Sequence, residues 1–276
     1  MAIMADTPQL ARLHDRALVA VQGPDWRSFL QGLLTQDVET LTVGELRYGA
    51  LLTPQGRLLF DLFMLGTEAG VLLDVEAARR DAFIQRLSMY RLRAKATVER
   101  AEGGVFVLWG AAPAPAPWIA DPRLPALGMR AYALEAPAGL NADAADYDAH
   151  RLELGVPDPA RDCAGETTYP IEADLDLLGG IDFKKGCFVG QETTSRMKRR
   201  GQIKSRMLPV TFDGPEPAPG AEVLATGNLR AGEVRSSSPG RAMALLRLDR
   251  AEGADLTIEG RPVKTAAPAW LTNAES

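Results

Sequence analysis

The sequence predicts an α+β protein that ends in a small antiparallel barrel or sandwich. Up to about residue 200, strand-like runs outnumber helical runs and often follow one another directly, which is typical of α+β proteins. After Gly201, short apolar runs alternate with turn residues almost to the C-terminus. The chain has 276 residues and 46% of them are hydrophobic, enough for one large domain or two smaller ones.

The N-terminal part contains predicted strands and helices at clear spacings. Apolar residues recur with helical period from Trp26 to Leu34, and Pro24 and Asp25 suit the start of that helix. The turn at residues 53–56, TPQG, joins two β-rich runs and indicates a hairpin. The predicted strands cover residues 16–22, 46–53, 57–65, 71–76, 95–100, 105–110 and 129–135, and the predicted helices cover 23–38, 76–92 and 145–155. The Pro/Ala-rich residues 111–118 are expected to form a surface connection.

Composition excludes several classes of function. The net charge of −5 argues against a basic nucleic-acid binder. His14 and His150 are the only histidines, which nearly excludes a histidine metal site or a Ser–His–Asp triad. No run of about 18 apolar residues is present, so no membrane span and no membrane partner are expected. Two cysteines and an N-terminus without a signal-peptide core predict a cytoplasmic protein.

The stretch KKGCFVGQETTSR, residues 184–196, places Cys187 in an unusual setting. Residues 190–201 predict a short helix closed by a glycine, which puts Cys187 just ahead of its N-terminus. The positive end of the helix dipole, together with Lys184 and Lys185, would favour thiolate over thiol. The residues therefore indicate a reactive cysteine.

Cations are concentrated around this cysteine. Eight basic residues lie between Lys184 and Arg206, where only Glu192 is acidic, and the rest of the chain holds 23 basic and 35 acidic residues. Such a patch favours an anionic ligand. The alternative interpretation is that neither feature has a function. A lone cysteine is more often a small buried hydrophobic residue, and a basic run is usually a solvated face. Cys163 has no comparable surroundings and is expected to be structural.

The same stretch resembles the K-G-C-[FY]-x-G-Q-E-x-x-x-R motif of the YgfZ-like folate-binding family, which is related in fold to the T-protein of the glycine cleavage system. Residues 23–38, 51–65, 150–158 and 169–186 and the closing segment also resemble parts of that family, so the resemblance covers nearly the whole chain. The motif matches at Lys185, Gly186, Cys187, Phe188, Gly190, Gln191, Glu192 and Arg196, with Phe188 where tyrosine is more usual.

The resemblance implies a T-protein-like fold, with intertwined α/β subdomains around a central channel and a small C-terminal antiparallel β-barrel. Residues 1–204 would form the folate-binding domain and residues 205–276 the barrel. The implied cofactor is tetrahydrofolate or another reduced folate. The implied role is assembly or repair of iron–sulfur proteins, including a tRNA-thiolating radical enzyme. Mitochondrial relatives of this family serve late [4Fe–4S] cluster maturation.

The resemblance also implies a site. Cys187 would be the functional thiol facing the folate, Lys185 would hold the thiolate or a folate carboxylate, and Arg196 would order the loop through Glu192. Glu172 would face the pterin, and Arg151 is a further candidate, with an ion pair inside the fold as the alternative. The other predicted folate- or loop-binding residues are Gly186, Phe188, Gly190 and Gln191. One cysteine cannot hold a cluster alone, so no metal site of its own is expected.

Three classes of function remain in competition. A folate-dependent accessory factor for iron–sulfur enzymes or cluster-assembly proteins is favoured, rather than a conventional enzyme. A folate-dependent aminomethyl or demethylating transferase on the same fold is the alternative, and the cysteine motif argues against it. A nucleic-acid module that uses the basic run is not expected, because the chain is acidic and the run lacks interleaved aromatic residues. A monomer is expected.

Overall fold

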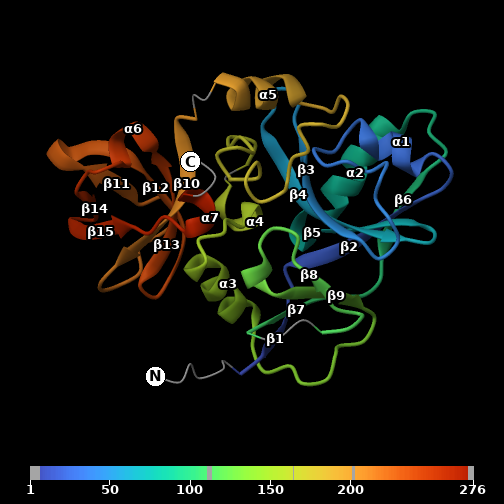
Figure 1. Ribbon diagram of the computed structural model, residues 1–276, viewed down its shortest axis with the longest axis horizontal. Coiled ribbons are helices and arrows are strands. Elements are labelled where there is room, and N and C mark those ends of the chain that lie inside the picture. Colours follow the sequence, from blue (N-terminus) through green and yellow to red (C-terminus); the bar gives the residue numbers. More distant parts are fainter. Residues whose placement is uncertain (1–6, 111–113, 164, 201–202, 273–276) are drawn as a thin grey trace. The chain divides into compact units, whose positions relative to one another are not determined.

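The structure is a computed structural model that describes residues 7–110, 114–163, 165–200 and 203–272 (Figure 1). The chain forms two compact units, and each unit is built from segments far apart in the sequence. Unit 1 contains Met1–Leu52, Phe60–Tyr147 and Leu178–Val189, and unit 2 contains Thr53–Leu59, Asp148–Leu177 and Gly190–Ser276.

Two antiparallel sheets build most of unit 1. The five-stranded sheet has the order β3-β4-β5-β2-β6, and the four-stranded sheet has the order β1-β7-β9-β8. The apolar runs of these strands supply buried side chains such as Val19, Leu62 and Leu73. The strands are β1 (Gln9–Arg12), β2 (Arg16–Gln22), β3 (Leu46–Leu52), β4 (Leu58–Thr67), β5 (Gly70–Glu76), β6 (Thr97–Ala101), β7 (Gly104–Trp109), β8 (Ile119–Ala120) and β9 (Met129–Ala133).

Helical segments accompany the two sheets of unit 1. Helix α2 (Arg80–Arg91) follows the single turn η1 (Ala77–Arg79) and buries Phe83 and Leu87, which lie four residues apart on one face. Another 3₁₀ turn, η2, spans Pro125–Leu127.

The first predicted helix is much shorter than the sequence pattern suggested. Residues 23–38 were expected to be helical, whereas α1 covers only Trp26–Gln31. Gly32 caps the helix, and Leu34 instead forms an isolated antiparallel bridge with Leu51. The apolar residues beyond α1 are still buried, so burial continues without helical structure.

Unit 2 contains a closed six-stranded barrel, with the strand order β10-β13-β12-β11-β14-β15. Alternating residues of its strands fill the barrel, and Val210, Val223, Val234 and Leu246 are fully buried. Closure pairs β10 with β15 and leaves no free sheet edge. The strands are β10 (Ser205–Phe212), β11 (Glu222–Ala225), β12 (Leu229–Ser238), β13 (Arg241–Arg247), β14 (Leu256–Ile258) and β15 (Arg261–Thr265), with the turn η3 (Thr226–Asn228) between β11 and β12.

Segments outside the barrel complete unit 2. The backbone N–H of Met207 donates to the carbonyl of Glu172 at 2.7 Å, and the Trp270 indole N–H donates to the carbonyl of Leu154 at 2.9 Å. These bonds tie the barrel to residues 148–177. The remaining helices are α3 (Ala144–Glu153), α4 (Pro159–Asp162), α5 (Gln191–Arg200), α6 (Leu248–Ala251) and α7 (Ala269–Thr272).

The predicted α+β class and the C-terminal barrel are confirmed, with the barrel preferred to the sandwich. The predicted hairpin is present as β3 and β4 around residues 53–56. Helix α5 follows the cysteine motif as expected, although its predicted end at Gly201 lies outside the described residues.

Candidate functional site

A loop of unit 1, residues 181–189, carries the motif cysteine, and we call it the thiol loop. Two backbone hydrogen bonds hold its ends against the segment that follows α1. The N–H of Asp182 donates to the carbonyl of Thr35 at 3.0 Å, and the N–H of Val189 donates to the carbonyl of Gly32 at 3.2 Å. The loop is therefore fixed at both ends to the same short segment.

Lys185 fixes the middle of the thiol loop. Its Nζ donates to the carbonyl oxygens of Gln31, Leu34 and Gln36 at 2.9, 2.7 and 2.8 Å. Burial lowers the pKa of Lys185 to about 8, and nearby carboxylates oppose that shift. These contacts occupy all three donors of a protonated ammonium group. Lys185 thus holds the loop, a different role from the predicted one of holding the thiolate or a folate carboxylate.

Cys187 is exposed, whereas its neighbour Phe188 is buried with 6% of its surface accessible. The Phe188 ring lies 5.6 Å from Lys185 Nζ, within range of a cation–π contact. On the other side, a Cβ at Gly186 would meet no atom within 4 Å, so the space there is open. The loop therefore buries Phe188 as an anchor and presents the thiol to solvent.

The segment that supports the thiol loop is itself ordered by side chains. Gln31 donates through Nε2 to Asp37 Oδ1 at 2.7 Å and accepts through Oε1 from the Val38 N–H at 2.7 Å. Burial raises the pKa of Asp37, but hydrogen bonds from Thr40 and Gln31 outweigh it and lower that pKa to about 2. These contacts were not predicted, because the apolar spacing of residues 23–38 indicated one continuous helix. Residues 32–38 instead follow α1 as a loop.

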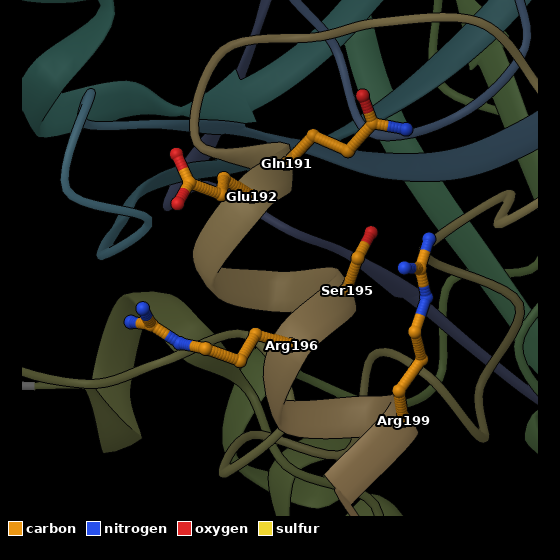
Figure 2. Close-up of a pocket in the computed structure, with 5 residues that line it drawn as sticks. All are labelled: Gln191, Glu192, Ser195, Arg196 and Arg199. Carbon is orange, nitrogen blue, oxygen red and sulfur yellow. The ribbon is translucent and has the colours of Figure 1, made fainter.

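Helix α5 of unit 2 lines a hollow of about 460 Å³ (Figure 2). Gln191, Ser195 and Arg199 project from one side of the helix, and Glu192 and Arg196 project from another. Glu192 and Arg196 were predicted to pair, yet no ion pair joins them in the part of the chain that the structure describes. The hollow carries more hydrogen-bond donors than acceptors.

The start of α5 depends on a glycine turn. Gly190 has φ +82°, a conformation that favours glycine, and its carbonyl accepts from the Thr194 N–H at 3.4 Å and the Thr194 hydroxyl at 3.2 Å. Thr194 is fully buried. The positive φ and these two hydrogen bonds give Gly190 of the motif a structural role at the start of α5.

Part of the basic run is structural. Lys198 pairs with Asp176 at 3.1 Å, and Arg206, which is 2% exposed, pairs with Asp174 at 2.7 Å and Asp176 at 3.0 Å. Arg196 and Arg199 are exposed and make no ion pair within the described residues. The cations free to meet an anionic ligand are thus fewer than the sequence count suggested.

The two further candidates lie in unit 2 and differ in availability. The Arg151 guanidinium is buried and donates to Asp148 Oδ1 at 2.7 Å, to Asp162 Oδ2 at 2.5 Å and to the Ser236 hydroxyl at 2.7 Å. Glu172 uses Oε2 to accept from the Tyr169 N–H at 2.8 Å. Burial raises the pKa of Glu172. The structure thus gives Arg151 the internal ion pair and leaves Glu172 as the candidate for a ligand.

Unit 1 also contains a buried ion network that sequence reasoning did not identify. Arg16 bridges Asp61 at 3.1 Å and Asp74 at 2.6 Å, and Arg130 joins Asp74 at 2.8 Å to Asp121 at 3.5 Å. Burial opposes ionisation, but the two arginines lower the pKa of Asp74. The available signal was an aspartate inside each of two apolar runs, RLLFDLFML and VLLDVE. The network links strands of both sheets.

No group of three His, Cys, Asp or Glu side chains within the described residues is placed to hold a metal ion. Cys187 could offer a cluster one soft ligand, whereas protein-bound iron–sulfur clusters generally have about four protein ligands. Any cluster that Cys187 binds would take its other ligands from elsewhere.

Comparison with known structures first defines the class of protein. Aminomethyltransferase T of the glycine cleavage system from Bartonella henselae matches with a TM-score of 0.78 over 96% of this chain and 86% of that chain, at 19% identity. The chain therefore has an aminomethyltransferase-like fold. Residues 204–273 match the model of the CAF17 C-terminal beta-barrel domain.

Sequence relatives then define the family. The chain is 33% identical to the human iron-sulfur cluster assembly factor IBA57, mitochondrial, covering 94% of this chain and 84% of the relative. It is 32% identical to the mouse protein of the same name, covering 88% and 78%. The chain belongs to the IBA57 family. The predicted cytoplasmic location is wrong by this comparison, because both relatives are named mitochondrial.

Proposed function

We propose that this protein is an iron–sulfur cluster assembly factor in which Cys187 is a transient cluster ligand. The observation that carries the proposal is the exposed thiol on a loop fixed by Lys185 and by both loop ends. Two relatives that the chain resembles over most of its length are named iron-sulfur cluster assembly factors, which supports the same role.

The proposed step is a ligand exchange at iron. The Cys187 thiol loses its proton and forms an Fe–S bond as a thiolate, while one thiolate of a partner protein leaves the same iron and takes up that proton. No electrons are exchanged. Because Cys187 supplies one ligand, the partner retains the others, and the cluster stays shared until it moves on. A fixed loop helps, because the thiol is already positioned when the partner arrives.

A reduced folate is part of the proposal as a bound cofactor, in line with the YgfZ-like motif. Glu172 fits a pterin, since its half-buried carboxyl group can accept from the amino and ring N–H groups of the pterin beside the bond it accepts from the Tyr169 N–H. Such a folate would supply one-carbon or redox chemistry. We leave Arg151 out of this site because its guanidinium is bound inside the fold. A tRNA-thiolating radical enzyme is one proposed client.

The alternative function is a folate-dependent aminomethyl or demethylating transferase, which the fold likeness to aminomethyltransferase T favours. Such a transferase needs a lipoyl carrier protein as substrate and has no need of a cysteine loop. Aminomethyl transfer by the purified chain, unchanged in Cys187→Ser, would establish this alternative.

The deciding experiment measures an iron–sulfur enzyme in cells that lack this gene, under oxidative stress. The cells would carry the wild-type protein, Cys187→Ser, or Cys163→Ser as a control that alters the half-buried cysteine. We expect the wild type and Cys163→Ser to restore activity and Cys187→Ser to fail, with all three proteins present at equal levels. Full restoration by Cys187→Ser would remove the thiol from the mechanism.

A further inference from the structure

A tight turn at the end of α2 contains Leu92 at a position with positive φ, which glycine usually occupies. The N–H of Ala94 donates to the carbonyl of Arg91 at 2.7 Å, which closes a four-residue turn. Leu92, the second residue of that turn, has φ +42° and ψ −101°. These angles lie near the first central position of a type II′ turn, which glycine normally occupies. A leucine in this conformation is strained.

The strain does not bring Leu92 into the core. Its side chain is 90% exposed, and Met89, one helical turn earlier, is 65% exposed. Scattered exposed hydrophobic residues are ordinary, but a strained one at the tip of a turn points to a function for the side chain itself.

Cationic residues flank the two apolar residues in the sequence. Arg86, Arg91, Arg93 and Lys95 all lie between residues 86 and 95, and no acidic residue occurs in that stretch of an otherwise acidic protein. Within the described residues, none of the four makes an ion pair. Arg91 donates to the carbonyl of Ala96 at 3.3 Å, so its charge is not neutralised.

The turn is also held firmly in place. The Lys95 N–H donates to the Asp25 carboxylate at 2.7 Å, and the Asp25 N–H donates to the Lys95 carbonyl at 3.3 Å. Gly23 packs so closely that a Cβ there would lie 2.5 Å from the Lys95 carbonyl oxygen. Leu92 is thus presented by a supported backbone.

We propose that this turn docks the protein on the surface of an anionic lipid bilayer. Leu92 and Met89 enter the region between headgroups, while Arg86, Arg91, Arg93 and Lys95 contact the lipid phosphates. A bilayer fits better than an acidic protein, because it surrounds any protruding side chain with apolar chains. A protein partner would have to supply the whole pocket for a leucine that is 90% exposed.

The proposal stands apart from the role of Cys187 and concerns contact with a membrane surface only. It departs from the expectation of no membrane partner, which rested on the lack of an apolar run long enough to span a bilayer. Within the described ranges, no helix is long and apolar enough to cross one. Peripheral docking needs no such helix.

The test is co-sedimentation of the full chain with vesicles of phosphatidylcholine plus phosphatidylglycerol, compared with phosphatidylcholine alone. The key variant is Leu92→Gly, which removes the side chain and suits the turn. Its thermal stability should equal or exceed that of the wild type, and its affinity for anionic vesicles should fall about tenfold, the factor expected for one buried leucine. Leu134→Gly, which removes another leucine that is 80% exposed, is the matched control and should bind like the wild type.

Three results would overturn the proposal. The first is equal binding of the wild type to both kinds of vesicle. The second is unchanged binding of Leu92→Gly, or an equal loss in Leu134→Gly. The third is binding to soluble polyglutamate without binding to anionic vesicles, which would assign the turn to an acidic protein partner instead.

Discussion

Lys185 fixes the middle of the thiol loop, which carries Cys187. Its three acceptors are carbonyl groups that α1 and the segment after it leave without helical partners. An ammonium group suits this task because it offers three donors on a flexible stem. The side chain of the motif lysine is therefore occupied in holding the loop that carries Cys187.

Replacing Lys185 by Met should destabilise the protein by about 2–4 kcal/mol, since it leaves three partly buried carbonyls without their charged donor. Urea denaturation measures this change. Lys184→Met is the matched control, because Lys184 is the exposed neighbour in the same loop and its loss should cost less than about 0.5 kcal/mol. Equal stability of the two variants would mean that the Lys185 hydrogen bonds contribute little.

At this scale the sequence predicted which residues belong to the motif but not what several of them contact. Cys187 was singled out from the helix predicted after it and from the nearby cations, and it is exposed. The partners of Lys185 lie 149 to 154 residues earlier in the chain. No local pattern reveals contacts at that separation, so the holding role of Lys185 was out of reach.

At the scale of elements, the turn between β3 and β4 and the helix α5 depend on each other within unit 2. Gly56 has φ +81°, and a Cβ added there would lie 2.8 Å from Thr193 Cβ on α5. The glycine is thus required twice, by the turn conformation and by the close approach of the helix. The hairpin turn predicted from TPQG therefore also packs against helix α5.

Gly56→Ala should therefore destabilise the protein by about 1–3 kcal/mol and increase hydrogen exchange at the start of α5. Gly186→Ala is the control within the motif, because its φ is not positive and its Cβ would meet open space. The control should change stability by less than about 0.5 kcal/mol. Unchanged stability and hydrogen exchange in Gly56→Ala would show that α5 can move to accommodate the added methyl group.

Element type was easier to predict than element extent. Strand runs and the barrel were found because their apolar periods are local. The helix predicted over residues 23–38 ended at Gln31, because hydrogen bonds to the distant thiol loop compete for the backbone that follows. Asp61 and Asp74 interrupt apolar strands, and only the fold shows that arginines from other strands neutralise them.

At the scale of the whole molecule, each compact unit gathers segments from both halves of the chain. The barrel shares unit 2 with residues 148–177, and Arg206 at the start of β10 lies against Asp174 and Asp176. The predicted boundary between residues 204 and 205 stays a prediction. The ion pairs of Arg206 cross this boundary, so a chain that ends at residue 204 tests it.

Ending the chain after residue 204 removes Arg206 and leaves Asp174 and Asp176, whose side chains are fully buried, without that partner. An uncompensated buried charge costs about 3–5 kcal/mol, a large share of the 5–15 kcal/mol that stabilises a typical domain. We therefore expect the fragment 1–204 to lack a cooperative thermal transition by circular dichroism. Arg206→Met in the full chain isolates the ion pairs and should lower stability by about 3–5 kcal/mol while the barrel remains folded. A fragment that melts cooperatively near the temperature of the full chain would instead mean that residues 1–204 fold independently and that the barrel is an appended domain.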